Sequence, residues 1–414
     1  MTVDTTQTAD ETHVQTQDAQ TAQAANDALA LLRSATPAAI DVLTCILTRG
    51  HIARIEIARL TGLSQAAVTK SVSPLIAAGL VSEESDLPRS GIPGRPVNPL
   101  RVNSDALVVL GIKVNANDII GVATGLSADV RTTTHQTIPD TRFDTIVEGI
   151  VSVADRLRDE LGQDVERLAG IGVTVSGDVD SSTGFVRESA LLGWNGLALG
   201  EVLQARLGTT VVVENDVRAL TIAEHWFGVG VGTESFAIVT IGAGIGSGLH
   251  VNGEVVEGAY GVAGEIGHLP LTSRDHVCSC GRRGCVEAVA SSGAIAAAVS
   301  RGHGGRELSF AEAIDLAHTG DAVARAAFDE AGTVIGTAIA TMVNLTGPEL
   351  VLISGEAVSD YDLYDERIRA AFAEQAFGAA ASCRIVTRPH TFDDWARGAA
   401  ATVIRALVTK RQTA

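Results

Sequence analysis

The stretch from Gly261 to Glu287 reads GVAGEIGHLPLTSRDHVCSCGRRGCVE and contains four side chains of metal-binding type. They are His268, Cys278, Cys280 and Cys285. Three cysteines and one histidine make a standard tetrahedral zinc set that leaves no position for water, so we expect a structural Zn²⁺. Gly281 and Gly284 permit the tight turns that three thiolates around one ion require. Free thiols and a disulfide are the alternatives, although nothing marks the chain as secreted, where disulfides are typical.

Two glutamates flank these ligands. Glu265 precedes His268 by three residues, and Glu287 follows Cys285 by two. An ionised glutamate only accepts hydrogen bonds, so carboxylates held on a rigid loop suit the hydroxyl groups of a polyol. The alternative is that both glutamates are ordinary solvated surface charges.

Length and composition predict an α/β protein of two or three domains with large buried cores. The chain has 414 residues, of which 46% are hydrophobic, 4% are aromatic and 43 are glycines. It has no apolar run long enough for a transmembrane helix and no secretory signal pattern at its N-terminus. We therefore expect a cytoplasmic, reducing location without membrane contact.

Charge is unevenly distributed along the chain. Residues 37–103 carry seven basic and five acidic residues, a net charge of +2, whereas the whole chain has a net charge of −18. A mildly basic module is thus attached to an acidic body, a pattern that is compatible with nucleic-acid binding by the module.

The first hundred residues predict a tail followed by a DNA-binding module. Residues 1–36 are rich in Thr, Gln, Ala and Asp and predict a disordered tail. Residues 37–80 have helical periodicity, with a turn at Thr61-Gly62-Leu63 and Ser64 as the N-cap of the next helix. A β-wing is expected to follow, and the winged helix-turn-helix is predicted to span 37–103.

The helix after Ser64 is the expected recognition helix, and the wing is expected to add two cations. The candidate DNA-binding residues are Gln65, Ala66, Thr69, Lys70, Ser73, Arg89 and Arg95. The alternative is a three-helix packing module that binds no DNA.

Residues 104–414 predict an α/β body built from two similar halves. Apolar strands such as ALVVLGIKV alternate with amphipathic helices in two successive rounds. One half is expected to span about 104–228 together with a C-terminal helix at 392–409, and the other about 229–391. A ligand cleft between the halves is expected.

These motifs resemble the ROK family, which joins transcriptional repressors with sugar kinases. The resemblance covers nearly everything from residue 37 to 409. Its most specific parts are GHLPLTSRDHVCSCGRRGCVE, VENDVRALTIAEHWFG and IGAGIGSGLHVNGEVVEGAYGVAGEIGH. It implies an actin-like, ribonuclease-H-like duplicated fold with a hinged cleft, and a structural zinc ion on the four residues named above.

The resemblance also implies which residues contact a sugar. The matching positions are Asn215, Asp216, Glu265, His268 and Glu287, with His268 binding both zinc and a sugar hydroxyl. In the family's kinases, the residue that matches Asp216 is the general base, which takes a proton from the hydroxyl to be phosphorylated.

Departures from the family pattern lie mainly on the nucleotide side. The Asp-x-Gly-Gly-Thr phosphate turn of the kinases is replaced by Lys113-Val114-Asn115-Ala116-Asn117. A second turn, Gly-Thr-Gly, reads Gly242-Ala243-Gly244, and a Gly-Gly pair reads Gly355-Glu356. On the sugar side, Ala190-Leu191 stand where the family often has Pro-Asn. Close approach of a backbone to phosphate requires glycine, so ATP binding is not expected.

The sequence therefore predicts a sugar-responsive DNA-binding regulator, not an enzyme, that represses carbohydrate uptake or metabolism genes. Its expected partners are operator DNA, a monosaccharide or sugar-derivative effector, and further copies of itself in a homodimer or a dimer of dimers. Two alternatives stay open: an ATP-dependent sugar kinase with an appended DNA-binding domain, and a constitutive DNA-binding protein whose body only dimerises.

Overall fold

A computed structural model describes residues 5–84 and 98–409, without the side chains of residues 5–18. The chain divides into two units, Met1–Gly232 with Ala396–Ala414 and Thr233–Trp395. The predicted division of the body between residues 228 and 229 lies close to this boundary. Among the described helices, none combines the length and the apolar character that a membrane span requires.

Helix α1, Thr5–Ser34, corrects the prediction of a disordered tail. Ala25, Ala28 and Leu32 lie on one face of this helix and are buried. The helix contacts the 3₁₀ segment η2 (Gly162–Arg167) of the same unit. Alanine has the highest helix propensity, and its burial on one face needs no large apolar side chains, which is why the composition was misleading.

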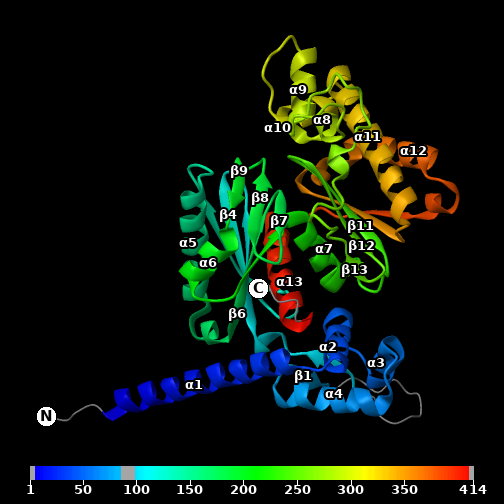
Figure 1. The fold of residues 1–414 in the computed structure, drawn as a ribbon. Coiled ribbons are helices and arrows are strands. Elements are labelled where there is room, and N and C mark those ends of the chain that lie inside the picture. Colours follow the sequence, from blue (N-terminus) through cyan, green and yellow to red (C-terminus); the bar gives the residue numbers. More distant parts are fainter. Residues whose placement is uncertain (1–4, 85–97, 410–414) are drawn as a thin grey trace. The chain divides into compact units, whose positions relative to one another are not determined.

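Helices and a short pair of strands follow α1 along the chain. They are α2 (Pro37–Arg49), α3 (Arg54–Thr61), α4 (Gln65–Ala77), β1 (Val81–Glu83) and β2 (Leu100–Val102). Of these, α2, α3, α4 and β1 are labelled in Figure 1. The strands pair antiparallel, and Ile52 forms a further bridge to Leu100. Buried residues from all three helices, among them Ile46, Ile57 and Val68, form the interior of this module.

The sheet of the first unit has the strand order β10-β6-β3-β4-β5. Its strands are β3 (Val108–Val114), β4 (Asp118–Gly125), β5 (Val130–Thr137), β6 (Leu168–Val175) and β10 (Val211–Asn215). The first three pair antiparallel, whereas β6 and β10 run parallel to β3. A smaller sheet contains β7 (Asp178–Asp180), β8 (Phe185–Ser189) and β9 (Trp194–Leu197).

The second unit repeats this topology with the order β13-β12-β11-β14-β15. Its strands are β11 (Phe236–Ile241), β12 (Ile245–Val251), β13 (Glu254–Val255), β14 (Leu350–Ser354) and β15 (Arg384–Thr387). Again three strands pair antiparallel and two are parallel to the first of them. The predicted duplication of an α/β fold is therefore present in the strand order of both units.

Helices cover each sheet (Figure 1). Those of the first unit are α5 (Phe143–Leu161), α6 (Leu199–Leu207), α7 (Asp216–Phe227) and α13 (Phe392–Thr409). Those of the second are α8 (Glu287–Ala290), α9 (Ser292–Gly302), α10 (Phe310–His318), α11 (Ala322–Thr346) and α12 (Asp365–Gln375). The segments η1 (Ser104–Ala106), η3 (Ile266–His268), η4 (Glu356–Leu363) and η5 (Gly378–Ser382) are 3₁₀ turns.

Helix α13 returns to the first sheet because two glycines let it approach the strands. On β3, Leu110 and Ile112 belong to the core that contains α5 and α6, whereas the alternate residue Gly111 faces α13. A Cβ on Gly111 would lie 2.0 Å from the carbonyl oxygen of Ala396, and one on Gly172 would lie 2.0 Å from that of Ala399. These are backbone atoms of a helix, which cannot move aside locally.

Gly111→Ala is therefore predicted to lower the stability of the protein, by about 1–3 kcal/mol or more, because the new methyl group overlaps helix backbone. Its effect is measured as the shift in the midpoint of thermal unfolding. Gly293→Ala is the matched control, since a Cβ there meets nothing within 4 Å. Equal midpoints for the two variants would contradict this packing of α13.

Candidate functional site

The loop from α3 to α4 presents one polar face of α4. Gly62 ends α3 in the left-handed region at φ 70°, which favours glycine. The Ser64 side chain accepts a hydrogen bond from the Ala67 N–H at 3.2 Å, which confirms the predicted N-cap. Val68 and Val72 lie on the opposite face of the helix and are buried in the interior of the module.

All five described residues of the predicted DNA-binding set are exposed. They are Gln65, Ala66, Thr69, Lys70 and Ser73. The Thr69 and Ser73 hydroxyls donate to the backbone oxygens of Gln65 and Thr69, each at 2.9 Å, which leaves their oxygen lone pairs as acceptors. Over the described residues, Lys70 forms no ion pair. The other two predicted residues, Arg89 and Arg95, lie outside the described residues.

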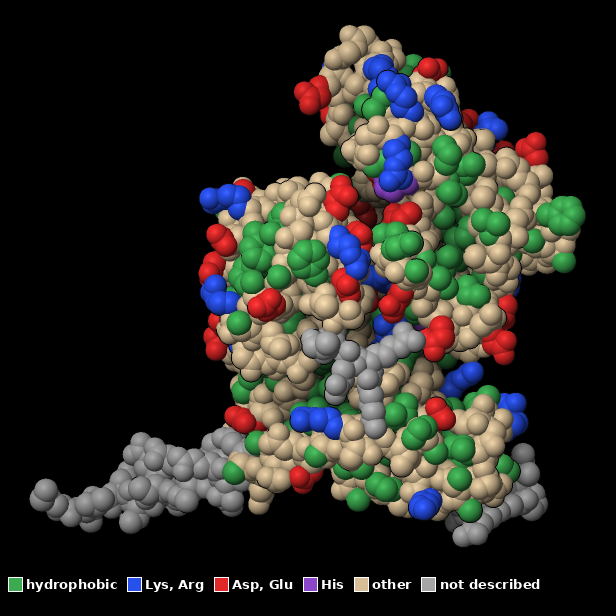
Figure 2. All heavy atoms as spheres, in the orientation of Figure 1, with side chains coloured by type: hydrophobic (Ala, Val, Ile, Leu, Met, Phe, Trp, Pro, Cys, Tyr) green, Lys and Arg blue, Asp and Glu red, His purple; other side chains and the backbone are tan. Residues whose placement is uncertain are grey.

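On the face of the molecule shown in Figure 2, the charged side chains are of both signs and are interspersed. With a net charge of −18, the chain as a whole offers no general attraction to a polyanion. Among the described residues, α4 presents an exposed polar face that includes Lys70.

Asn215 and Asp216 lie at the junction of β10 and α7, in the first unit. The Asn215 side chain accepts from the Arg218 N–H at 3.0 Å and caps α7, while its amide donates to the Gly177 carbonyl at 2.9 Å. Asn215 thus fixes the loop after β6 against the start of the helix. The Asn215 side chain thus forms hydrogen bonds within the protein through both its oxygen and its amide nitrogen. Fewer of its groups are then available for the predicted contact with a sugar.

Asp216 is paired with Lys113, at the end of β3. Their side chains are 12% and 6% exposed, and the Lys113 ammonium donates to the Asp216 carboxylate. From the sequence alone, Lys113 was recognised only as a departure from a phosphate turn, and its pairing with Asp216 was missed. A single lysine in the otherwise apolar strand ALVVLGIKV was the available signal, because a buried ammonium requires a partner.

A second buried ion pair supports the same junction. The Arg218 guanidinium donates to the Glu214 carboxylate at 2.7 Å and to the Val179 carbonyl at 2.8 Å. The Asn215 N–H donates to the same Glu214 oxygen at 2.8 Å. These bonds hold the start of α7 rigidly between β10 and the small sheet, so Asp216 has a fixed position.

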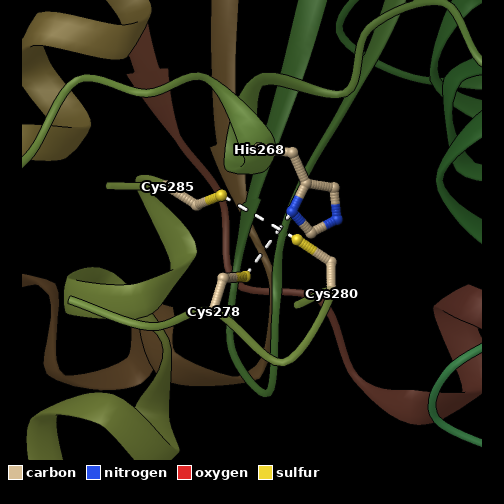
Figure 3. Close-up of side chains that lie close together, drawn as sticks. All are labelled: His268, Cys278, Cys280 and Cys285. Atoms are coloured by element: carbon tan, nitrogen blue, oxygen red, sulfur yellow. Dashed lines mark hydrogen bonds between the residues drawn. The ribbon is translucent and has the colours of Figure 1, made fainter. Parts of the chain in front are cut away.

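The four predicted metal ligands come together in the second unit (Figure 3). One ligand atom from each of His268, Cys278, Cys280 and Cys285 lies within 4.8 Å of the others. The Cys278 sulfur is 3.8 Å from Nδ1 of His268, and the sulfurs of Cys280 and Cys285 are 3.9 Å apart. This donor set can hold a soft divalent metal ion.

Backbone turns build this cluster. His268 ends η3, and Gly267 lets η3 approach β12, because a Cβ there would lie 2.0 Å from the Ile245 carbonyl oxygen. In the cysteine loop, the Cys278 N–H donates to the Arg282 carbonyl at 2.9 Å, and Gly281 has φ 79°. The left-handed conformation of Gly281 agrees with the prediction that this turn requires glycine.

Burial raises the pKa of the Cys285 thiol to about 12, and it raises the pKa of Cys278 as well. Without a cation the buried thiols therefore favour their neutral form. A metal ion binds the thiolate form, so its binding would release protons and offset the unfavourable burial of charge.

The two glutamates of this region differ in their surroundings. Glu287, at the start of α8, accepts from the Ile245 N–H at 3.2 Å and from the Ser279 hydroxyl at 3.1 Å. It also lies 3.8 Å from the Cys278 sulfur. Glu265 is exposed and directly precedes η3. Glu287 is therefore tied to the cysteine loop, and Glu265 reaches solvent.

Comparisons with known proteins agree with the resemblance found in the sequence. The sequence model of one family, described as "ROK family", matches residues 109–406. An N-acetylglucosamine repressor of Escherichia coli O157:H7 is 28% identical over 367 residues, which are 87% of this chain and 90% of the relative.

Solved structures show the same fold. A ROK family transcriptional regulator, a homologue of the Escherichia coli MLC protein, matches with a TM-score of 0.75 and 27% identity over 89% of this chain and 96% of its own. A ROK hexokinase from Thermus thermophilus matches with a TM-score of 0.62 and 25% identity over 72% of this chain and 97% of its own.

Cys280→Ser is predicted to lower the metal content of the purified protein, because a hydroxyl is a poor substitute for a thiolate in this donor set. Metal per chain is measured by inductively coupled plasma mass spectrometry. Cys383→Ser is the matched control, a thiol of the same unit outside the cluster. A full metal complement in the Cys280 variant would contradict the assignment of Cys280 as a ligand.

Proposed function

The chain belongs to the ROK family, and from this premise we propose that it is a sugar-responsive DNA-binding transcriptional regulator. In this proposal it represses genes of carbohydrate uptake or metabolism. The effector is a monosaccharide or a sugar derivative, and the DNA-bound form is a homodimer or a dimer of dimers. Two copies related by two-fold symmetry suit a palindromic operator.

One observation carries the proposal. The family model begins at residue 109, and the likeness to a hexokinase covers 72% of the chain. The likeness to a transcriptional regulator covers 89%. The additional helices α2, α3 and α4 precede the family body, and a sugar kinase has no need of them. The N-acetylglucosamine repressor also aligns over 87% of the chain.

The proposed DNA contact is the exposed face of α4. Its short polar side chains can approach base edges in a major groove, and Lys70 supplies a cation for a phosphate. Arg89 and Arg95, which lie outside the described residues, are proposed as further phosphate contacts. Such contacts would add affinity at low salt and little sequence preference.

For the effector, we propose Asp216 in the first unit and Glu265, His268 and Glu287 in the second. Asn215 is proposed mainly as a positioning residue, and its side-chain amide has one further N–H group that can donate to the sugar. A structural Zn²⁺ on the Cys₃His cluster would fix η3 and the start of α8, and with them the glutamates. Glu287 accepts bonds from both the cysteine loop and β12, which supports this coupling.

We propose that the protein is not an enzyme. A general base must take a proton from the reacting hydroxyl, whereas Asp216 is buried against the Lys113 ammonium. An ATP-dependent sugar kinase with an added DNA-binding domain is the alternative, because a hexokinase has the same fold.

Operator binding measured across a panel of monosaccharides tests the function. We expect at least one sugar to change the apparent Kd for the operator, since a ligand shifts an equilibrium only by differential binding. Glu265→Gln is expected to weaken that sugar's affinity about tenfold or more, the loss of one hydrogen bond to a charged group. Glu374→Gln, another exposed glutamate of the same unit, is the control.

Tight operator binding that no sugar alters, together with no heat of sugar binding in calorimetry, would favour the constitutive alternative. Calorimetric sugar binding without any effect on the operator would instead contradict the coupling between the two sites.

Lys70→Ala is predicted to weaken operator binding several-fold and to make the dependence on salt less steep, because one phosphate contact is lost. Sugar affinity should not change. Fluorescence anisotropy at several salt concentrations measures both effects, with Arg306→Ala as the control for loss of an exposed cation elsewhere. Unchanged DNA affinity and salt dependence would show that α4 is not the DNA-contacting helix.

A further inference from the structure

The turn between β11 and β12 directs two backbone donors at carboxylates of its own unit. This turn is Gly242–Gly244. The Ala243 N–H donates to Oε1 of Glu356 at 2.7 Å. The Ile245 N–H donates to Oε2 of Glu287 at 3.2 Å. Two acids, from segments far apart in the sequence, thus accept from the N–H groups of Ala243 in the turn and of Ile245 at the start of β12.

The turn needs its glycines for these contacts. A Cβ on Gly242 would lie 2.0 Å from Oε1 of Glu356, and one on Gly244 would lie 2.8 Å from Oε2 of Glu287. Neither glycine has a positive φ, so backbone conformation is not the reason for glycine here. The space of the missing side chains is filled by the two carboxylates.

The segment before Glu356 holds this side chain at the turn. Gly355 links β14 to η4 with φ 110°, a conformation that other residues rarely adopt. A Cβ there would lie 2.4 Å from the Ile241 carbonyl oxygen, so the link is pressed against the end of β11. The approach of Glu356 to the turn is therefore fixed by its own backbone.

A backbone N–H group in a glycine-rich turn can donate to an oxyanion, and the Ala243 N–H is the one that Glu356 occupies here. Carboxylate and phosphate oxygens are acceptors of the same kind for such a donor. Glu356 is exposed, so a dissolved anion could reach the Ala243 N–H if the carboxylate were absent. While it is present, the tethered group competes at a high effective concentration and repels another anion.

We propose that Glu356 is a built-in anion that fills the oxyanion site at Gly242–Gly244 and keeps phosphate-bearing ligands out of it. The second unit would then lack phosphate binding because an internal carboxylate occupies the turn, although both glycines of the turn are present. The inference rests on hydrogen bonds within the second unit and needs neither DNA nor sugar binding.

The test is calorimetric titration of the full-length protein with inorganic pyrophosphate. Glu356→Ala removes both the occupant and its charge, so we expect it to bind pyrophosphate about tenfold or more tightly than the unchanged protein. Glu356→Gln keeps a neutral acceptor over the turn and should give a smaller gain. Binding in the Gln variant also decides the question if the Ala variant fails to fold.

Glu349→Ala is the matched control. Glu349 stands at the other end of β14 and accepts from the N–H groups of Glu234 and Ser235 at 3.0 and 3.4 Å. Its removal changes the net charge equally but opens no glycine turn. A folded Glu356 variant that binds no better than this control would overturn the proposal. Tight binding of pyrophosphate by the unchanged protein would also contradict this proposal, whereas the non-enzymatic function is tested separately by ADP release.

Discussion

The buried ion pair between Lys113 and Asp216 is the constraint on which the chemistry of the first unit depends. It joins the central strand β3 to the first residue of α7, and both side chains are almost completely buried. Removing either partner would leave an uncompensated buried charge, which is strongly destabilising. The carboxylate of this junction is therefore already bonded to an ammonium group within the protein.

In the second unit, two carboxylates are likewise bonded within the chain, to backbone N–H groups and a hydroxyl. The Glu287 carboxylate links the cysteine loop to β12, and that of Glu356 accepts from the turn before β12. Each unit has kept the strand order of the duplicated fold while its carboxylates are held by partners within the chain. We infer that carboxylates held in this way favour recognition of a ligand by hydrogen bonding over transfer of a phosphoryl group.

Local sequence patterns predicted the elements of this fold well, and long-range pairings poorly. The expected helix at 392–409 coincides with α13, because its apolar periodicity is contained within one segment. Helix α1 was missed because its buried face consists largely of alanines. The partners of Lys113 and Glu356 lie 103 and 113 residues away, so the sequence identified both residues as departures without revealing their roles. The four metal ligands were found because three of them lie within one short loop.

The central claim is that this ROK chain recognises a sugar without phosphorylating it. The most direct test is a coupled measurement of ADP release with ATP, Mg²⁺ and each of the monosaccharides in turn, on the metal-loaded protein. The account predicts no sugar-dependent ADP release with any of them. Sugar-dependent ADP release by the unchanged protein would contradict it, because a sugar would then be phosphorylated despite the pairing of Asp216 with Lys113.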